Sequence, residues 1–176
     1  MKRYLVIMML CFPSLCALAQ LPAKPSVISI IIGDSLCEIR SVVTQTEFKP
    51  GWKIVDLKTK DKYTRYIWGR HSRQFADDRQ PVFVVTPEPG RTLNDYAVIR
   101  LKEKKEFRRL PSTSLFECGF ERIDLDNANI QLLADESYRV RFKQAFEPGE
   151  YILVDMKGEP KSEFGDVEVY PFTILR

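Results

Sequence analysis

Short runs of β-branched and aromatic residues, separated by turn residues, constrain the fold of this chain more than any other feature. The clearest runs are residues 27–32, 96–103 and 151–156, and about ten such runs follow one another from residue 27 onward. No window longer than about ten residues has the 3.6-residue periodicity of an amphipathic helix. This spacing predicts an all-β chain that folds as a mostly antiparallel two-sheet β-sandwich with little helix.

The runs differ in how clearly apolar and polar residues alternate along them. Within 96–103, Ala97, Ile99 and Leu101 share one face of the predicted strand, and the residues between them share the other. Residues 111–129 keep no clean period, so we expect a long connection there with a short strand or helical turn. The other predicted strands are 39–46, 52–57, 63–68, 81–86, 106–110, 130–133, 138–142 and 167–174.

A turn followed by an apolar strand gives a further indication of the architecture. Residues 146–151 read Phe-Glu-Pro-Gly-Glu-Tyr, and the Pro148-Gly149 turn places Tyr151 at the start of the strand. This segment resembles the tyrosine corner of immunoglobulin-like and related sandwich domains, in which the Tyr hydroxyl bonds to nearby backbone. The resemblance covers residues 146–154 and implies architecture, not function. Immunoglobulin domains have a Cys where this chain has Leu153, so the resemblance implies no inter-sheet disulfide at that position.

The first 19 residues have the three parts of a secretory signal peptide. Lys2 and Arg3 form a basic start, residues 5–12 are apolar, and Ala19 ends a small-x-small cleavage site. The apolar run is shorter than the about 20 residues that cross a bilayer. We therefore expect a secreted or periplasmic protein with no transmembrane segment and with cleavage after Ala19. A flexible leader over 20–26 and a single domain over 27–176 would follow.

The cysteines divide between the signal segment and the mature chain. Cys11 and Cys16 each follow a leucine, whereas a lipoprotein signal needs a small residue there, so no lipid anchor is expected. Cys37 and Cys118 remain, and an oxidising compartment favours a disulfide between them. The alternative is two free, buried thiols that act as small hydrophobic side chains. The two cysteines with His71 do not complete a zinc site, so we expect no metal and no cofactor.

The charge balance narrows the class of partner. The chain has a formal net charge of +3, and the signal segment holds two basic residues and no acidic one, which leaves the mature chain at +1. A nearly neutral protein has no general attraction to nucleic acid or anionic lipid, so we expect no nucleic-acid partner. Any basic surface must be local.

Aromatic and cationic side chains alternate over residues 63–73. In a strand, Tyr66, Trp68 and Arg70 share one face, and Arg73 follows closely. Trp, Tyr and Arg dominate the energetics of protein interfaces, and aromatic rings also stack on sugars. This pattern predicts a binding face for a protein or glycan partner. The alternative is a strand whose aromatic face lies in the core while its arginines extend to solvent.

A basic segment over residues 100–109 extends this candidate site. Arg108 and Arg109 at its end are predicted to join the aromatic face. Two other interpretations remain open. The segment is also typical of a charged edge that prevents sheets from pairing between molecules, and it would suit docking of an anionic glycan or phosphate.

A four-residue motif suggests catalysis instead. Residues 33–36, Gly-Asp-Ser-Leu, follow the first strand and resemble the first block of the GDSL (SGNH) esterases. The resemblance implies that Ser35 is the nucleophile of a small secreted hydrolase. That family also needs an Asp-x-x-His near the C-terminus, but the only histidine is His71, with Trp68 three residues before it. A hydrolase would therefore need His71 within hydrogen-bond reach of Ser35 or another nucleophile; otherwise the motif is a turn.

Two acidic patterns are weaker. Residues 124–129 resemble a calcium loop, but Ala128 occupies the fifth position and Asn129 stands where that loop has Gly, so we favour a solvated turn. Asp34, Asp155 and Asp166 flank predicted strands, and a glycosidase needs two carboxyl groups about 5–10 Å apart, a distance that sequence does not give.

The sequence thus predicts an exported, non-catalytic binding protein of a bacterial-type cell envelope. Its partner would be a protein or a glycan, bound through the aromatic and basic face. A small secreted hydrolase centred on Ser35 is the first alternative. The second is a structural subunit of a surface assembly, which exposed edge strands would favour.

Overall fold

The computed structural model describes residues 26–49, 53–54, 57–58, 62–112, 115–157 and 166–175. Their strands form three main sheets and one two-stranded ribbon, with almost all neighbouring strands antiparallel. The predicted all-β sandwich is confirmed. Within the described residues, helical structure is confined to the 3₁₀ turns η1 (Leu93–Asp95) and η2 (Leu115–Glu117).

The first sheet has five strands and forms one outer layer. Its strands, in spatial order, are β14 (Ala128–Leu132), β15 (Tyr138–Phe142), β9 (Val82–Thr86), β1 (Val27–Ile32) and β2 (Ser35–Glu38). A two-residue turn at Gly33 and Asp34 joins β1 to β2. Gly33 has a φ of 58°, a left-handed conformation that glycine adopts without steric cost.

The central sheet is buried on both faces. Its strands, in order, are β13 (Phe120–Arg122), β10 (Tyr96–Arg100), β16 (Gly149–Asp155), β17 (Glu168–Ile174) and β3 (Val42–Val43), with β8 (Phe75–Ala76) parallel to β17. Side chains on both faces of β10, β16 and β17 are buried. This double coverage explains why residues 151–154 are continuously apolar instead of alternating.

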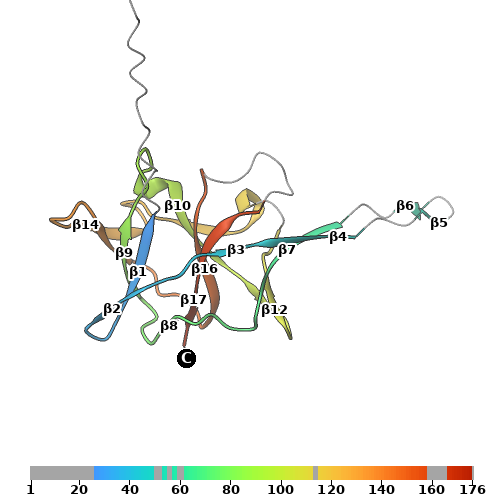
Figure 1. Cartoon of the computed structure of the whole chain (residues 1–176), viewed down its shortest axis with the longest axis horizontal. Coiled ribbons are helices and arrows are strands. Elements are labelled where there is room, and N and C mark those ends of the chain that lie inside the picture. Colours follow the sequence, from blue (N-terminus) through green and yellow to red (C-terminus); the bar gives the residue numbers. More distant parts are fainter. Residues whose placement is uncertain are drawn as a thin grey trace, which may run out of the picture.

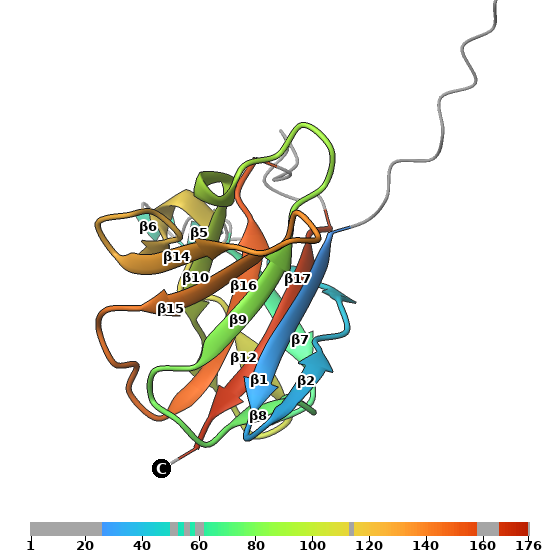
Figure 2. The same ribbon diagram turned by 90° about the vertical axis from the view of Figure 1, so that its left-hand side faces the viewer.

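The third sheet covers the other face of the central sheet. Its strands, in order, are β11 (Lys102–Glu103), β12 (Phe107–Arg109), β7 (Lys62–Trp68) and β4 (Gln45–Lys49). The hairpin of β4 and β7 extends away from the body, with the ribbon of β5 (Lys53–Ile54) and β6 (Leu57–Lys58) beyond its end (Figure 1). Figure 2 shows the first sheet in front, the central sheet behind it, and β7 and β12 further back.

Two hydrophobic cores separate the three layers. The core between the first and central sheets includes Ile28, Ile30, Phe83, Val85, Phe142, Tyr96, Val98, Leu153 and Phe172. The core between the central and third sheets includes Ala97, Ile99, Leu101, Ile152, Val154, Ile67 and Leu115. The predicted shared face of Ala97, Ile99 and Leu101 is confirmed. The third layer was not predicted, because the sequence pattern indicated only two sheets.

Tyr151 makes the hydrogen bond that the tyrosine-corner resemblance implies. Its hydroxyl donates to the carbonyl oxygen of Glu147 at 2.7 Å, and its ring stacks on Phe172 with centroids 5.7 Å apart. Burial raises the pKa of the Tyr151 hydroxyl above its ordinary value. A relationship to immunoglobulin-like domains stays a prediction.

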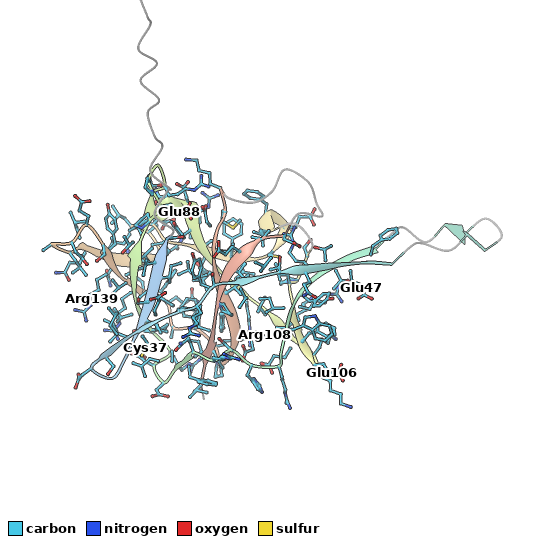
Figure 3. The ribbon with its side chains drawn as sticks, viewed as in Figure 1. Cys37, Glu47, Glu88, Glu106, Arg108 and Arg139 are labelled. Atoms are coloured by element: carbon cyan, nitrogen blue, oxygen red, sulfur yellow. The ribbon has the colours of Figure 1, made fainter. Side chains whose placement is uncertain are left out.

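The predicted Cys37–Cys118 disulfide is wrong, because neither of these cysteines is in a disulfide. Cys37 lies on β2 and packs against the core between the first and central sheets (Figure 3). Cys118 is buried in the core between the central and third sheets. The central sheet therefore lies between the two sulfur atoms, and a disulfide needs Cα atoms within about 7 Å of each other.

The signal peptide, its cleavage site and residues 20–25 of the predicted leader lie outside the described residues. Ser26, the last residue of that leader, is buried. Its hydroxyl lies 2.9 Å from the Tyr170 hydroxyl, which also donates to the Ser26 carbonyl oxygen at 3.2 Å. The packed domain therefore includes Ser26. Across the described ranges, no helix has the length and apolarity needed to span a membrane.

Replacing Tyr151 with Phe should lower the free energy of unfolding by about 1 kcal/mol, because the ring contacts remain and one buried hydrogen bond is lost. Urea denaturation measures this change. Tyr138→Phe is the matched control, since Tyr138 packs, partly buried, against the same core as Tyr151 but donates no side-chain hydrogen bond within the described residues. Equal stabilities for the two variants would contradict a stabilising role of the corner.

Both thiols should react with iodoacetamide in denaturant without any reductant. Mass spectrometry of the digested protein should then find the Cys37 and Cys118 peptides alkylated, because neither sulfur is in a disulfide. Recovery of a crosslinked Cys37–Cys118 peptide would contradict the layer arrangement.

Candidate binding site on the third sheet

Three aromatic side chains lie together on the face of the third sheet that points away from the central sheet. Phe107 pairs with Trp68 across β12 and β7, so both share a face with Tyr66, while Ile67 between them is in the core. Ring centroids are 5.5 Å apart for Tyr66–Trp68, 5.4 Å for Tyr66–Phe107 and 6.3 Å for Trp68–Phe107. We call Tyr66, Trp68 and Phe107 the aromatic patch.

Trp68 is the most exposed member of the aromatic patch. Its side chain is 56% exposed, yet the indole is held in place because Nε1–H donates to Oε1 of Gln45 on β4 at 2.7 Å. The alternative in which this aromatic face lies in the core is therefore wrong for Trp68. Arg109 pairs with Tyr66 across the strands and so lies on the same face, as predicted.

The other predicted arginines follow the end of β7. Gly69, with a φ of 88°, turns the chain out of the strand, and Arg70 and Arg73 lie exposed beyond it. Arg73 lines a hollow of about 800 Å³ beside Trp68. Arg70 lines a neighbouring hollow of about 560 Å³ that also reaches His71. The predicted site residues therefore do not share one surface. Tyr66, Trp68 and Arg109 lie on the sheet face, whereas Arg70 and Arg73 line the two hollows.

Arg108 does not belong to the exposed face, and its predicted role there is wrong. It pairs with Ile67, so its side chain points to the opposite face of the sheet from Arg109 and is buried (Figure 3). Nε donates to the carbonyl oxygen of Gly69 at 3.1 Å, and Nη2 donates to that of Trp68 at 3.4 Å. Burial lowers the pKa of Arg108, and the charge of Glu150 opposes that shift.

The fully buried carboxylate of Glu150 is the centre of a polar network. Oε2 accepts from Nη1 of Arg108 at 3.2 Å and from the backbone N–H of Ser72 at 3.0 Å. Oε1 accepts from Oγ1 of Thr173 at 2.7 Å and from Nδ1 of His71 at 3.0 Å. These bonds join β12, β16, β17 and the loop after β7, and so fix the loop that carries Arg70 and Arg73.

Sequence reasoning missed Phe107 and Glu150. Glu150 had a recognisable signal, because it shares a strand face with Ile152 and Val154 and so places one charge inside an apolar run. A buried charge requires ionic or hydrogen-bonding partners, and His71, the single histidine of the sequence, was one such candidate. Phe107 had no signal, because its place beside Trp68 depends on the register of β12 against β7.

The proposed hydrolase residues are not brought together. Ser35 begins β2 at the hairpin turn, whereas Nδ1 of His71 is bonded to Glu150. No hydrogen bond joins Ser35 to His71 in the part of the chain that the structure describes. The condition that the sequence set for an esterase based on Ser35 is therefore not met in this structure.

The acidic patterns have local structural roles. Oδ1 of Asp124 accepts from the backbone N–H groups of Asp126 at 3.1 Å and Asn127 at 2.9 Å, which makes this segment a turn. Asp155 pairs with Nε of Arg91 at 2.7 Å. Among the described residues, no group of three or more His, Cys, Asp or Glu side chains is placed to hold a metal ion.

The comparisons with known proteins identify no relative: no family model matches the chain, and neither a curated protein nor a solved structure does.

Replacing Arg108 with Met should destabilise the protein by about 3–5 kcal/mol, because the Glu150 carboxylate stays buried without its guanidinium partner. Urea denaturation tests this expectation. Arg141→Met is the control, since Arg141 pairs with Asp78 at the surface and such pairs contribute at most about 1 kcal/mol. The double variant Arg108→Met/Glu150→Gln should lose less free energy of unfolding than the sum of the losses in the two single variants. A cost for Arg108→Met as small as for Arg141→Met would show that the network does not stabilise the fold.

Proposed function

We propose that this chain is an exported, non-catalytic binding protein and that a partner protein docks on the aromatic patch. The observation that carries the proposal is Trp68, a large side chain that is 56% exposed and yet fixed by a hydrogen bond to Gln45. Ordering a side chain on binding costs conformational entropy, and an indole that is already held avoids much of that cost. Tryptophan is also among the residues most enriched at interface hot spots.

The arrangement of the rings favours a protein over an extended glycan. The ring planes of the aromatic patch meet at angles of 90°, 53° and 79°, so they form no coplanar platform for successive sugar rings. Such edge-to-face contacts are typical of packed aromatic clusters. Arg109 beside Tyr66 adds a cation at the edge of the patch, as in many protein interfaces.

Export is the part of the proposal that rests on sequence alone. A basic start, a short apolar run and a small-x-small site within residues 1–19 support a signal peptide. In an envelope or extracellular setting, an exposed aromatic patch on a stable sheet is suited to recognition of another protein.

The wild-type protein, immobilised and exposed to an envelope extract of its source organism, should capture a partner that Trp68→Ala captures poorly. Phe116→Ala is the matched control, because Phe116 is 57% exposed and belongs to η2, outside the third sheet. The purified partner should bind Phe116→Ala like wild type and Trp68→Ala about 30-fold more weakly, as for a hot-spot residue. Identical capture and affinity for both variants would exclude the aromatic patch as the docking site.

A further inference from the structure

We propose, on the basis of the proposed function, that the partner presents an acidic segment and that its carboxylates enter the hollow beside Trp68. This hollow, which we call the basic groove, has a volume of about 800 Å³ and lies between residues 40–42 and the segment 67–74. Arg40, Arg73, Arg108 and His71 line it, and no carboxylate is among its described lining residues.

The arginines of the basic groove differ in whether they already pair with a carboxylate of this chain. Arg108, in the floor, is already neutralised by Glu150. Arg40 and Arg73 are exposed, and neither forms an ion pair with any residue in the described ranges. The two charges of Arg40 and Arg73 are therefore uncompensated, and they stand together in a chain whose net charge is only +3.

The chemistry of the floor favours carboxylates. Here the Glu150 carboxylate is held by a guanidinium, a backbone N–H and an imidazole N–H, a donor set that suits a planar two-oxygen anion. Arginine donates two parallel N–H groups that match a carboxylate, which lysine cannot do. Arg40 and Arg73 offer the same type of donor to a carboxylate that comes from outside.

His71 contributes a further polar group to the groove. Because a carboxylate only accepts hydrogen bonds, Nδ1 of His71 is the donor to Glu150 and Nε2 is left for a ligand. The His71 side chain is 49% exposed, so solvent and ligands reach it. Trp68, shared by the aromatic patch and the basic groove, places an apolar surface next to the cations. A segment that alternates acidic and apolar residues fits both features.

The proposal is tested with poly-L-glutamate as the probe. The sequence holds two tryptophans, so a Trp52→Phe background makes the fluorescence of Trp68 a reporter at the rim of the groove. Poly-L-glutamate should change this fluorescence and bind more tightly at low salt, whereas poly-L-lysine should not bind. The double variant Arg40→Glu/Arg73→Glu should bind poly-L-glutamate at least tenfold more weakly.

The control variant is Arg122→Glu/Arg139→Glu, which changes the net charge equally at exposed positions on β13 and β15. It should bind poly-L-glutamate within about threefold of the parent protein, since a local site depends on local charge more than on net charge. All variants should retain the circular dichroism spectrum and melting temperature of the parent. Equal weakening by both double variants would overturn the proposal, because only net charge would then matter.

Three further outcomes separate the possible explanations. Heparin that binds through Arg40 and Arg73 while poly-L-glutamate does not would overturn the proposal and assign the groove to sulfated glycans. Loss of partner capture by Trp68→Ala, with poly-L-glutamate binding unaffected by Arg40→Glu/Arg73→Glu, would overturn the groove and leave the aromatic patch in place. In a third outcome, Arg40→Glu/Arg73→Glu weakens poly-L-glutamate binding but Trp68→Ala leaves partner capture unaffected. This result would support the basic groove and would exclude the aromatic patch as the docking site.

Discussion

The buried carboxylate of Glu150 is the interaction on which the rest of the structure depends. A lone carboxylate inside an apolar sheet would be strongly unfavourable, and four donors from three separate parts of the chain compensate for that cost here. Because Arg108 also donates to the carbonyl oxygens of Gly69 and Trp68, the same network fixes the end of β7. The charge of Glu150 therefore holds the loop that carries Arg73 directly, through His71 and Ser72, and holds the end of β7 at Trp68 through Arg108.

Burial of the central sheet on both faces determines which sheets have a face that points to solvent. The first sheet covers one face and the third sheet covers the other, so β10, β16 and β17 supply apolar side chains in both directions. The third sheet has only one face to bury, and its strands alternate accordingly: Ile67 and Arg108 point inward, while Trp68 and Arg109 point outward. The candidate binding surface exists because this outer layer has no further sheet packed on it in the described chain.

The fold was predictable where the pattern is local, and the site was predictable only in part. Alternation along β7 identified Tyr66 and Trp68 as sharing a face, and a turn motif anticipated the Tyr151 hydrogen bond four residues back. Arg108 and Arg109 are adjacent and chemically identical, so only the register of β12 against β7 assigns one to the core and the other to solvent. The Cys37–Cys118 pairing failed for the same reason, because cysteine spacing does not reveal which layer holds each sulfur atom.

The sequence by itself determined the strand-rich character of the chain, its turn positions and the shared face of Tyr66 and Trp68, since these follow from local turn residues and from side-chain alternation within single strands. That this face is exposed at Trp68 was decided by the tertiary structure. Only the tertiary structure decided that a third layer covers the central sheet, that Arg108 neutralises Glu150, and that residues 40–42 meet the segment 67–74 to form the basic groove. The physical reason is that periodicity is a property of one strand, whereas burial and charge pairing depend on which distant strand packs against it.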